Sequence, residues 1–458
     1  MAEQELEQAE EPAELVARAA AIDVAKDSGM VCTRVPHESR GGRRVQKVWG
    51  VTARFTAVTE LADHLVCQAI ERVVLEATSD YGRIWFYLLE AAGLQVWLVN
   101  ARDVKNVPGR PKTDKLDSVW LCKLNERGML RPSFVPPEEI RDLRALTRLR
   151  ATLTAGCSRH KQRTEKLLED ALVKVSAVVS ELFGKSGRAM MRALVAGERD
   201  PKMLAGLALG RPRPRQAQLA EALTGRFRDV HAYEIGLLLD LVETLEARIT
   251  ELDGEIEAHL IALPGVPPAC ASCGLIGGGH APGCGNHGAQ LLSLPQRLDE
   301  ITGVGVVTAQ VIIAEAGLDM GQFPTAGHAS AWAKLSPRTI QSGARTRAGK
   351  TGKGNRWLRG ALGDAAMAVG KTDTYLGERY RRIRRRRRRR GKQKAIVATA
   401  RAILEIAYLL ISNRDLRFHD LGAGYYDRLG PQRRTRNKIR ELERLNPGMK
   451  VTLTAAAA

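Results

Sequence analysis

The sequence lacks the apolar segments that mark a secreted or membrane protein. Its first residues are acidic and contain no apolar core of the kind that a signal peptide requires. The most apolar late stretch, residues 395–411, is one helix long and carries Arg401 and Glu405, so it fits an amphipathic core helix better than a membrane span. We therefore expect a cytoplasmic protein without a membrane partner.

Acidic residues and cysteines are also scarce. The 458 residues include 51 Asp and Glu against 71 Lys and Arg, giving a formal charge of +20. This excess favours a polyanionic partner, because neutralising phosphates releases counterions. The seven cysteines include four scattered ones, Cys32, Cys67, Cys122 and Cys157, which is typical of ordinary buried thiols. The other three are clustered, and in the cytoplasm a cluster indicates a metal before a disulfide.

The length allows two to four domains, and the pattern of apolar and polar residues changes along the chain. After an acidic leader (1–18), residues 19–135 alternate between strand and helix signals, which predicts an α/β sheet. The first two strands are joined too tightly for a parallel crossover, so they should pair antiparallel. We expect strands at 20–27, 29–35, 43–51, 71–78 and 94–100, and helices at 57–69, 81–92 and 114–125.

The remainder of the chain is predicted to be all-α. A helical or coiled-coil region covers 136–263, with a break at RPRPR (211–215) that cannot continue a helix. A Gly/Cys/His-rich insert (264–290), a mainly helical basic domain (291–421) and a polar, loosely ordered tail (422–458) follow. Within this region, apolar residues recur at alternating spacings of four and three, forming a short seam of Leu238, Val242, Leu245, Ile249, Leu252 and Ile256. This spacing fits a coiled coil and an amphipathic helix in a local bundle equally well.

Four carboxylates in the α/β part form a candidate metal site. Asp23 is in the middle of the first predicted strand, Glu76 ends a later strand, and Asp114 and Asp117 share one face of a helical first turn. Divalent ions prefer such oxygen ligands and stabilise both oxygens of a phosphodiester exchange. Taken singly, each has a structural explanation, such as a strand edge or an N-cap at Asp114. Asp23 is the unusual one, because apolar strand neighbours make an uncompensated carboxylate costly.

The order IDVAKD, LEATSDYG and LVNARDVKNVPGRPKTDKLDS resembles the RuvC-like DEDD domain of insertion-sequence transposases related to the Piv DNA invertase. The resemblance covers residues 19–135. It implies an RNase-H-like fold in which Asp23, Glu76, Asp114 and Asp117 bind Mg²⁺. The Gly/Arg-rich loop at 38–44 departs from the pattern, because it looks longer than a simple hairpin turn.

The segment LDEITGVGVVTAQVIIAEAG (298–317) predicts a helix, a Gly-Val-Gly turn and a second helix. Such a helix-hairpin-helix presents backbone N–H groups and a helix N-terminus to a phosphate without reading sequence. Gly303 and Gly305 are the candidate contacts. The signal is weak alone, because a tight turn between helices needs glycine in any case.

Ser342 is followed by Gly343 in a loop rich in glycine and cations. A serine can attack a phosphodiester when cations stabilise the developing charge, although the residues alone favour a serine that only hydrogen-bonds to phosphate. The run at 381–394 is the densest charge on the chain and predicts contact with a nucleic-acid backbone. The candidate nucleic-acid-binding cations are Arg345, Arg347, Lys350, Lys353, Arg356 and Arg359 around the serine, and Arg384, Arg386 and Arg388 in the run.

The segments LDEITGVGVVTAQVIIAEAG, SPRTIQSG, KTGKGNRWLRGAL and KAIVATARAIL resemble, in this order, the second domain of the same transposases. The resemblance implies that Ser342 is the nucleophile and forms a transient 5′-phosphoserine link to DNA. Ser330 and Ser336 lack the Ser-Gly context. It also implies guidance by a structured RNA that the element encodes. We expect a dimer or tetramer in which the two domains complete each other, with the helical middle as the interface.

The insert contains five candidate zinc ligands. Zinc takes four, typically in a tetrahedron, and Cys270, Cys273, Cys284 and His287 give two matched short loops. His280 in place of His287 would resemble a zinc knuckle with altered spacing, and a flexible loop with reduced thiols is the alternative. The insert is not part of the family pattern, and zinc here would be structural.

Together these features predict an enzyme with an α/β plus all-α architecture that cuts and rejoins DNA during insertion-sequence mobility. Site-specific DNA inversion is compatible with every motif. One rival is a RuvC-like structure-specific nuclease that uses activated water in place of Ser342. The other is a non-enzymatic, basic nucleic-acid-binding scaffold, against which the complete carboxylate set argues.

Overall fold

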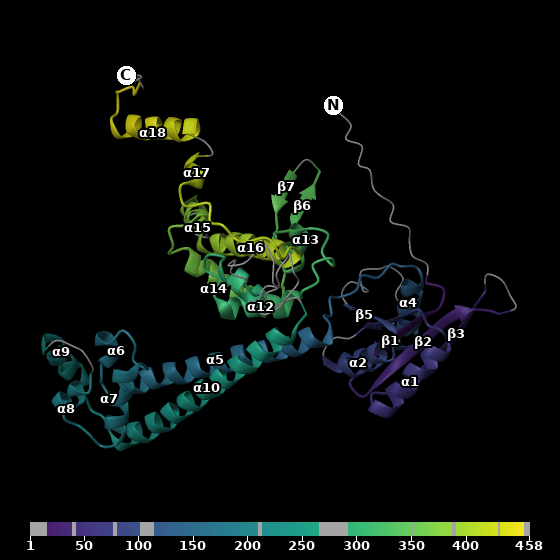
Figure 1. Ribbon diagram of the computed structural model, residues 1–458, viewed down its shortest axis with the longest axis horizontal. Helices are drawn as coiled ribbons and strands as arrows, with labels where there is room; N and C mark the ends of the chain where they lie inside the picture. The colour runs from purple at the N-terminus through teal and green to yellow at the C-terminus, as the bar shows by residue number, and fades with distance from the viewer. Residues whose placement is uncertain are drawn as a thin grey trace, which may run out of the picture. The chain divides into compact units, whose positions relative to one another are not determined.

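The computed structural model describes most of the chain, and it divides into two units, Met1–Pro136 and Pro137–Ala458 (Figure 1). The Cys/His-rich insert with Cys270, Cys273, Cys284 and His287 lies outside the described residues, as do Lys350 and Arg388. The described residues are 16–38, 43–76, 80–100, 114–208, 213–264, 292–343, 345–349, 351–386, 391–428 and 431–452.

A five-stranded mixed sheet forms the centre of the first unit, in the order β3-β2-β1-β4-β5. The two chain-neighbouring pairs β1–β2 and β2–β3 are antiparallel, whereas β1–β4 and β4–β5 are parallel. The prediction that the first two strands pair antiparallel is therefore confirmed. The strands are β1 (Ala19–Val24), β2 (Ser28–Pro36), β3 (Arg44–Thr52), β4 (Arg72–Glu76) and β5 (Gln95–Val99).

Helices cover both faces of this sheet because its central strands are apolar on both sides. Even-numbered residues of β1, such as Ala20 and Ile22, pack with α1 (Phe55–Cys67) and α2 (Arg83–Ala91). Ala19 and Ala21 face the other way and pack with α4 (Asp114–Glu126). The predicted α/β character of this part is confirmed.

A long antiparallel helix pair begins the second unit. The helices α5 (Glu138–Asp170) and α10 (Asp229–Ala262) lie side by side, with Arg150 Nη1 2.8 Å from Asp253 Oδ1 and Lys161 Nζ 2.7 Å from Glu246 Oε1. The seam found in the sequence packs within this pair. Short helices fill its far end: α6 (Val175–Val178), α7 (Lys185–Val195), α8 (Pro201–Gly206) and α9 (Arg213–Leu223).

The RPRPR motif is only partly a helix break. The helix α9 begins at Arg213 and carries Pro214 in its first turn, where a missing backbone N–H costs no helical hydrogen bond. The break therefore lies before Arg213, and the second half of the motif is helical.

The remaining helices share one apolar core with the near end of α5 and α10. Ile140 and Ile256 from the long pair join Ile312, Leu362 and many other side chains in it. This confirms the prediction of a mainly helical remainder. The helices are α11 (Leu294–Asp299), α12 (Val306–Ala316), α13 (Ala326–Trp332), α14 (Arg356–Val369), α15 (Tyr375–Arg386) and α16 (Gly391–Ser412).

Among the described residues, α16 is the one helix that is long and apolar enough to cross a membrane by length and composition alone. It packs against α13, α14 and α15, and it buries Ala400, Ile403 and Leu404 in the common core. In this structure it is a core helix, which agrees with the sequence-based interpretation of residues 395–411.

Two segments differ from their predictions. The expected loop around Ser342 is an antiparallel hairpin of β6 (Thr339–Ser342) and β7 (Arg345–Ala348), because β-branched residues line both strands and Gly343 adopts a φ of +56° at the turn. The tail is not loosely ordered throughout, since it contains α17 (Tyr425–Arg428) and α18 (Pro431–Leu445).

Candidate metal site and nucleic-acid interface

Asp23 and Glu76 lie next to each other on parallel strands. They are register partners between β1 and β4, at the carboxyl ends of both strands. Neighbouring strands are about 4.8 Å apart, and register partners point to the same face of a sheet. Glu76 is buried and Asp23 is half-buried. The sheet therefore brings two of the four predicted carboxylates side by side.

The shared face is the one that α4 covers. Along β1 the side chains of Ala19, Ala21 and Asp23 point the same way, and along β4 so do those of Val74 and Glu76. Ala19, Ala21 and Val74 all pack with α4. Both carboxylates thus extend the strip of sheet beneath this helix.

The C-terminal half of α4 is fixed at the beginnings of β1 and β4. Near its C-terminus, Asn125 Nδ2 donates to Ala20 O (3.1 Å) and to Arg72 O (3.2 Å), at the beginnings of β1 and β4. Cys122, three residues earlier on α4, contacts the same end of β1, because its Sγ donates to Ala19 O at 3.4 Å. These contacts fix the C-terminal half of α4 at this end of the two strands.

Asp117 also lies on the correct stripe of the helix. Leu121 and Leu124 follow it by four and seven residues and are buried against the sheet, while Asp117 is half-buried. Asp114 is the first residue of α4, but its side chain lies outside the described residues. The structure thus places Asp23 and Glu76 side by side and puts Asp117 on the sheet-facing stripe of α4, but it does not gather Asp23, Glu76 and Asp117 closely enough to hold a metal.

The donor chemistry of these positions fits a hard divalent cation. Carboxylate oxygens are the ligands that Mg²⁺ prefers, and adjacent carboxylates repel each other unless a cation or proton compensates. No group of three or more His, Cys, Asp or Glu side chains close enough to hold a metal occurs among the described residues, which do not include the side chain of Asp114.

Sequence reasoning missed Asn125 as a positioning residue. It is fully buried, and its single amide nitrogen connects α4 to both β1 and β4. These two hydrogen bonds hold the C-terminal half of α4 to both strands, whereas the buried Oδ1 of Asn125 has no hydrogen-bond partner. The signal available in the sequence was a polar residue directly after the apolar Leu124 in a predicted helix.

The four scattered cysteines are not all buried. Cys32, Cys122 and Cys157 are, but Cys67 at the end of α1 is exposed. Cys32 and Cys122 bring together β2 and α4, and the hydrogen bond from Cys122 lowers the pKa of the Cys32 thiol. The same hydrogen bond, together with burial, raises the pKa of Cys122.

In the second unit, the hairpin places Ser342 beside two guanidinium groups. Ser342 is the register partner of Arg345, and Ile340, two residues earlier, is the partner of Arg347. Residues two apart on a strand share a face, so Ser342, Arg345 and Arg347 lie on one face of the hairpin. All three are exposed. A phosphate at this face could contact the hydroxyl and both cations.

A buried carboxylate that the sequence analysis missed organises the start of α14. Glu315 is fully buried on α12, where Arg148 from α5 forms a two-pronged ion pair with it, at 2.7 and 2.8 Å. Arg144 Nε lies 3.3 Å from Oε2 of the same residue. Asn355 Nδ2 donates to Glu315 Oε2 at 2.5 Å, and its Oδ1 accepts the backbone N–H of Trp357 as the cap of α14.

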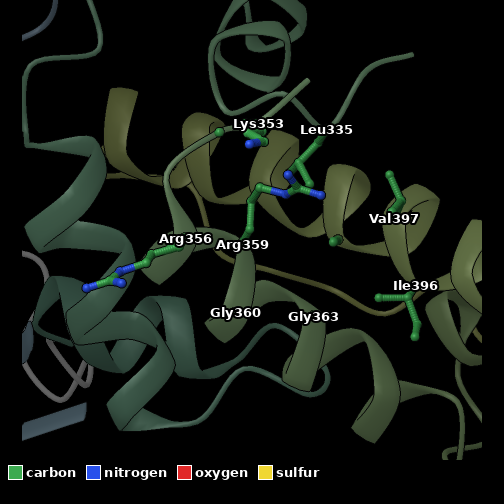
Figure 2. A pocket seen from close by; sticks show the side chains of 10 residues that line it. Leu335, Lys353, Arg356, Arg359, Gly360, Gly363, Ile396 and Val397 are labelled. Atoms are coloured by element: carbon green, nitrogen blue, oxygen red, sulfur yellow. The ribbon is translucent and has the colours of Figure 1, made fainter. Parts of the chain in front are cut away.

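A pocket of about 490 Å³ lies between the start of α14, the end of α13 and α16. Figure 2 shows Arg359 extending toward Lys353 and Leu335, whereas Arg356 points away from them. Arg359 Nη1 donates to Gly352 O at 3.0 Å, and Arg356 lies over the Trp357 ring at 4.5 Å. The pocket thus gathers three of the predicted nucleic-acid-binding cations.

The predicted glycine contacts differ in their surroundings. Gly303 has a φ of +84°, and a Cβ there would lie 2.4 Å from Val369 Cγ2, so packing on α14 accounts for this glycine. Gly305 is the exposed N-cap of α12, and the exposed Val306 and Val307 follow it. Of the two, Gly305 is the one that a phosphate could reach.

The arginine run forms the end of α15 up to Arg386, and its last residues, 391–394, begin α16, while 387–390 lie outside the described residues. Arg384 is exposed on this helix, and the side chain of Arg386 lies outside the described residues. Two cations of the run, Arg381 and Arg385, form ion pairs with Glu378. Part of the run therefore stabilises its own helix.

An aromatic cluster connects α15 to α17. Tyr375 and Tyr426 stack with ring centroids 5.3 Å apart, and Arg382 lies 4.7 Å above Tyr426. Burial, with the hydrogen bond from Tyr426, raises the pKa of Tyr375. The aromatic rings pack against one another, and this packing holds α17 against α15.

Comparisons with known proteins match both units. A DEDD transposase model of the IS110 type, described as "Transposase", matches residues 20–172, and one described as "Transposase IS116/IS110/IS902 family" matches residues 295–381. A protein of Pseudomonas aeruginosa described as "Probable family 20 transposase" is 26% identical over 299 residues, which cover 65% of this chain and 70% of the relative. The first match contains the carboxylates and the second contains Ser342.

Proposed function

We propose that this chain cuts and rejoins DNA with a carboxylate-bound metal and a serine nucleophile. The chain belongs to the IS110-type family of DEDD transposases and is a DNA-recombining enzyme. The observation that carries the first half is the register pairing of Asp23 with Glu76 on the face of the sheet that packs with α4. The one that carries the second is the shared hairpin face of Ser342, Arg345 and Arg347.

Enzymes of the DEDD transposase family typically use a divalent metal. Asp23, Glu76 and Asp117 would hold Mg²⁺, with Asp114 as a fourth ligand from the first turn of α4. The bound ion would stabilise negative charge on the phosphate oxygens. The residues themselves fix the position of the DNA phosphate, because two of them are on strands and two on a helix that Asn125 anchors.

Ser342 Oγ would attack the phosphorus of the DNA backbone. The Oγ–P bond forms, the serine proton is lost, and the P–O3′ bond breaks as the departing 3′ oxygen takes up a proton. Arg345 and Arg347 stabilise the charge that develops on the phosphate. Attack by another 3′ hydroxyl on the phosphoserine reverses these changes and rejoins the strand, so no external energy source is needed.

Several finer features belong to the same proposal. The sheet order, with three antiparallel strands followed by two parallel ones, supports an RNase-H-like fold. The formal charge of +20 supports a guide RNA in addition to DNA. A dimer or tetramer would allow the two units of different subunits to act together, and Gly305 at a helix N-terminus supports phosphate contact by a helix-hairpin-helix. The protein would act in the cytoplasm.

The decisive experiment uses purified protein, its co-purified RNA, DNA carrying the element ends, and Mg²⁺. We expect a covalent protein–DNA adduct that Ser342→Ala abolishes. The matched control is Thr346→Ala, which changes the opposite face of the same hairpin and should preserve the adduct. Strand cleavage that persists in Ser342→Ala would overturn the nucleophile and favour a nuclease that activates water.

The carboxylates are tested separately by Asp23→Asn. We expect recombination to be lost while DNA binding remains, since the substitution removes charge but hardly changes side-chain volume. Unchanged recombination would overturn the assignment of Asp23 as a metal ligand. Sequencing of co-purified RNA tests the guide, and the orientation of the recombined DNA separates transposition from inversion.

A further inference from the structure

We propose that the pocket beside α14 binds a single unpaired nucleotide, with the phosphate at its cationic rim and the base against its apolar wall. The proposal rests on the proposed function, since it assigns a binding site to a DNA-recombining enzyme. The observations that carry it are the chemistry of the lining, the volume, and two glycines that the fold does not require.

The lining divides into a cationic and an apolar part. Lys353 and Arg359 lie at one side, and Ile396 and Val397 of α16 lie at the other (Figure 2). None of the ten described lining residues is acidic. An anionic ligand with one flat apolar part matches this division, and a nucleotide is such a ligand. The volume of about 490 Å³ is large enough for a nucleotide.

The duplex form of DNA or RNA does not offer this combination. Paired bases are stacked inside the helix and expose only their edges and the phosphates. A base can contact the apolar wall only after it has left the stack, which recombining enzymes encounter when strands are opened. The pocket therefore fits an unpaired nucleotide of either a DNA or an RNA strand.

Two lining glycines are placed within the helix α14, where glycine is unfavourable relative to alanine. A Cβ on Gly360 would meet nothing within 4 Å, and a Cβ on Gly363 would meet only Ile396 Cγ2, at an ordinary contact distance of 3.9 Å. Neither residue has a positive φ. The protein's own packing and backbone thus do not require glycine here, and space for a ligand explains both.

The test replaces Gly360 by a side chain that fills the pocket and favours a helix. Gly360→Leu is compared with Gly254→Leu, because Gly254 is an exposed glycine inside α10 whose Cβ would also meet nothing within 4 Å. Fluorescence anisotropy measures the affinity for labelled dT12, rU12 and a 12-base-pair duplex, and thermal unfolding measures stability. Arg359→Gln is measured in parallel over a series of salt concentrations.

We expect Gly360→Leu to weaken binding of a single-stranded probe by about tenfold, with unchanged duplex binding and an unchanged or higher Tm. The dependence of affinity on salt should be unchanged in this variant, because the wall makes no ionic contact, and should become weaker in Arg359→Gln. Loss with dT12 alone identifies a DNA strand as the source, and loss with rU12 alone identifies RNA. Gly360→Ala should raise the Tm and weaken binding less.

Equal affinity of Gly360→Leu and the wild type for both single strands would overturn the proposal. An equal loss in Gly254→Leu would also overturn it, because the effect would then not belong to the pocket. Failure of the proposed function gives a different result: Asp23→Asn and Ser342→Ala would leave recombination intact, whatever the pocket variants do to binding.

Discussion

Removing the charge of Glu315 should destabilise the second unit and disturb the start of α14. Glu315 is fully buried, and Arg148, Arg144 and Asn355 all contact its carboxylate. Glu315→Gln keeps the shape and one oxygen, but it leaves two arginines without their counter-charge. Breaking a buried ion pair on one side costs about 3–5 kcal/mol.

The structure places the cost at the lower end of this range. The side chain of Arg148 is 36% exposed, so water can solvate it when its partner is lost, while Arg144 is 16% exposed and less able to do so. Arg144 also retains its bonds to the carbonyls of Ala314 and Glu315. We therefore expect a loss of about 3 kcal/mol in the free energy of unfolding.

Urea denaturation followed by circular dichroism measures this loss, because helices dominate the second unit. The control is Glu251→Gln, whose partner Arg248 is exposed on α10 and whose loss should leave the free energy of unfolding nearly unchanged. A second variant, Arg148→Met combined with Glu315→Met, should recover part of the stability, because only Arg144 then remains without its counter-charge. A cost below about 1 kcal/mol in Glu315→Gln would refute the reasoning.

Three further predictions concern other parts of the chain. Asn125→Leu should cost about 2–4 kcal/mol, because two buried strand carbonyls lose their donor; chemical denaturation checks it, and a neutral result would show that water replaces the amide. The hydrogen bond from Arg417 lowers the pKa of Glu300, so this pair should stabilise the fold above the ordinary carboxyl pKa and lose its effect as the pH falls through the lowered value; Glu300→Gln should remove that part of the pH dependence of the Tm. Chelation with EDTA should abolish DNA cleavage, and added Mg²⁺ should restore it; activity that survives chelation would contradict the metal assignment.

The pairing of Asp23 with Glu76 was predictable because its signals are local. Asp23 interrupts an apolar strand and Glu76 ends another. Each of these strands can be recognised in the sequence from its length and composition. Parallel neighbours then bring their carboxyl ends to one edge without further information. The distance of 53 residues between Asp23 and Glu76 does not matter, because the sheet fixes their register.

Other features were not accessible because they depend on distant partners. Glu315 lies within an apolar helix and receives Arg148 from 167 residues away, so nothing near it in the sequence predicts an ion pair. The sequence around Ser342 predicts a loop, because glycines and cations dominate its composition. The two strands of the hairpin there are only four residues each, too short to give a strand pattern. The pocket combines segments as far apart as Leu335 and Ala400.

The pairing of Asp23 with Glu76 has a consequence for how the length of this protein can vary. Successive strand residues point to opposite faces, so one residue inserted into β4 before Glu76 would turn that carboxylate toward α1 and α2. One residue added to the connection between β3 and α1 would leave the pairing unchanged. Related sequences should therefore differ in length between the strands, while insertions and deletions within β1 and β4 are eliminated.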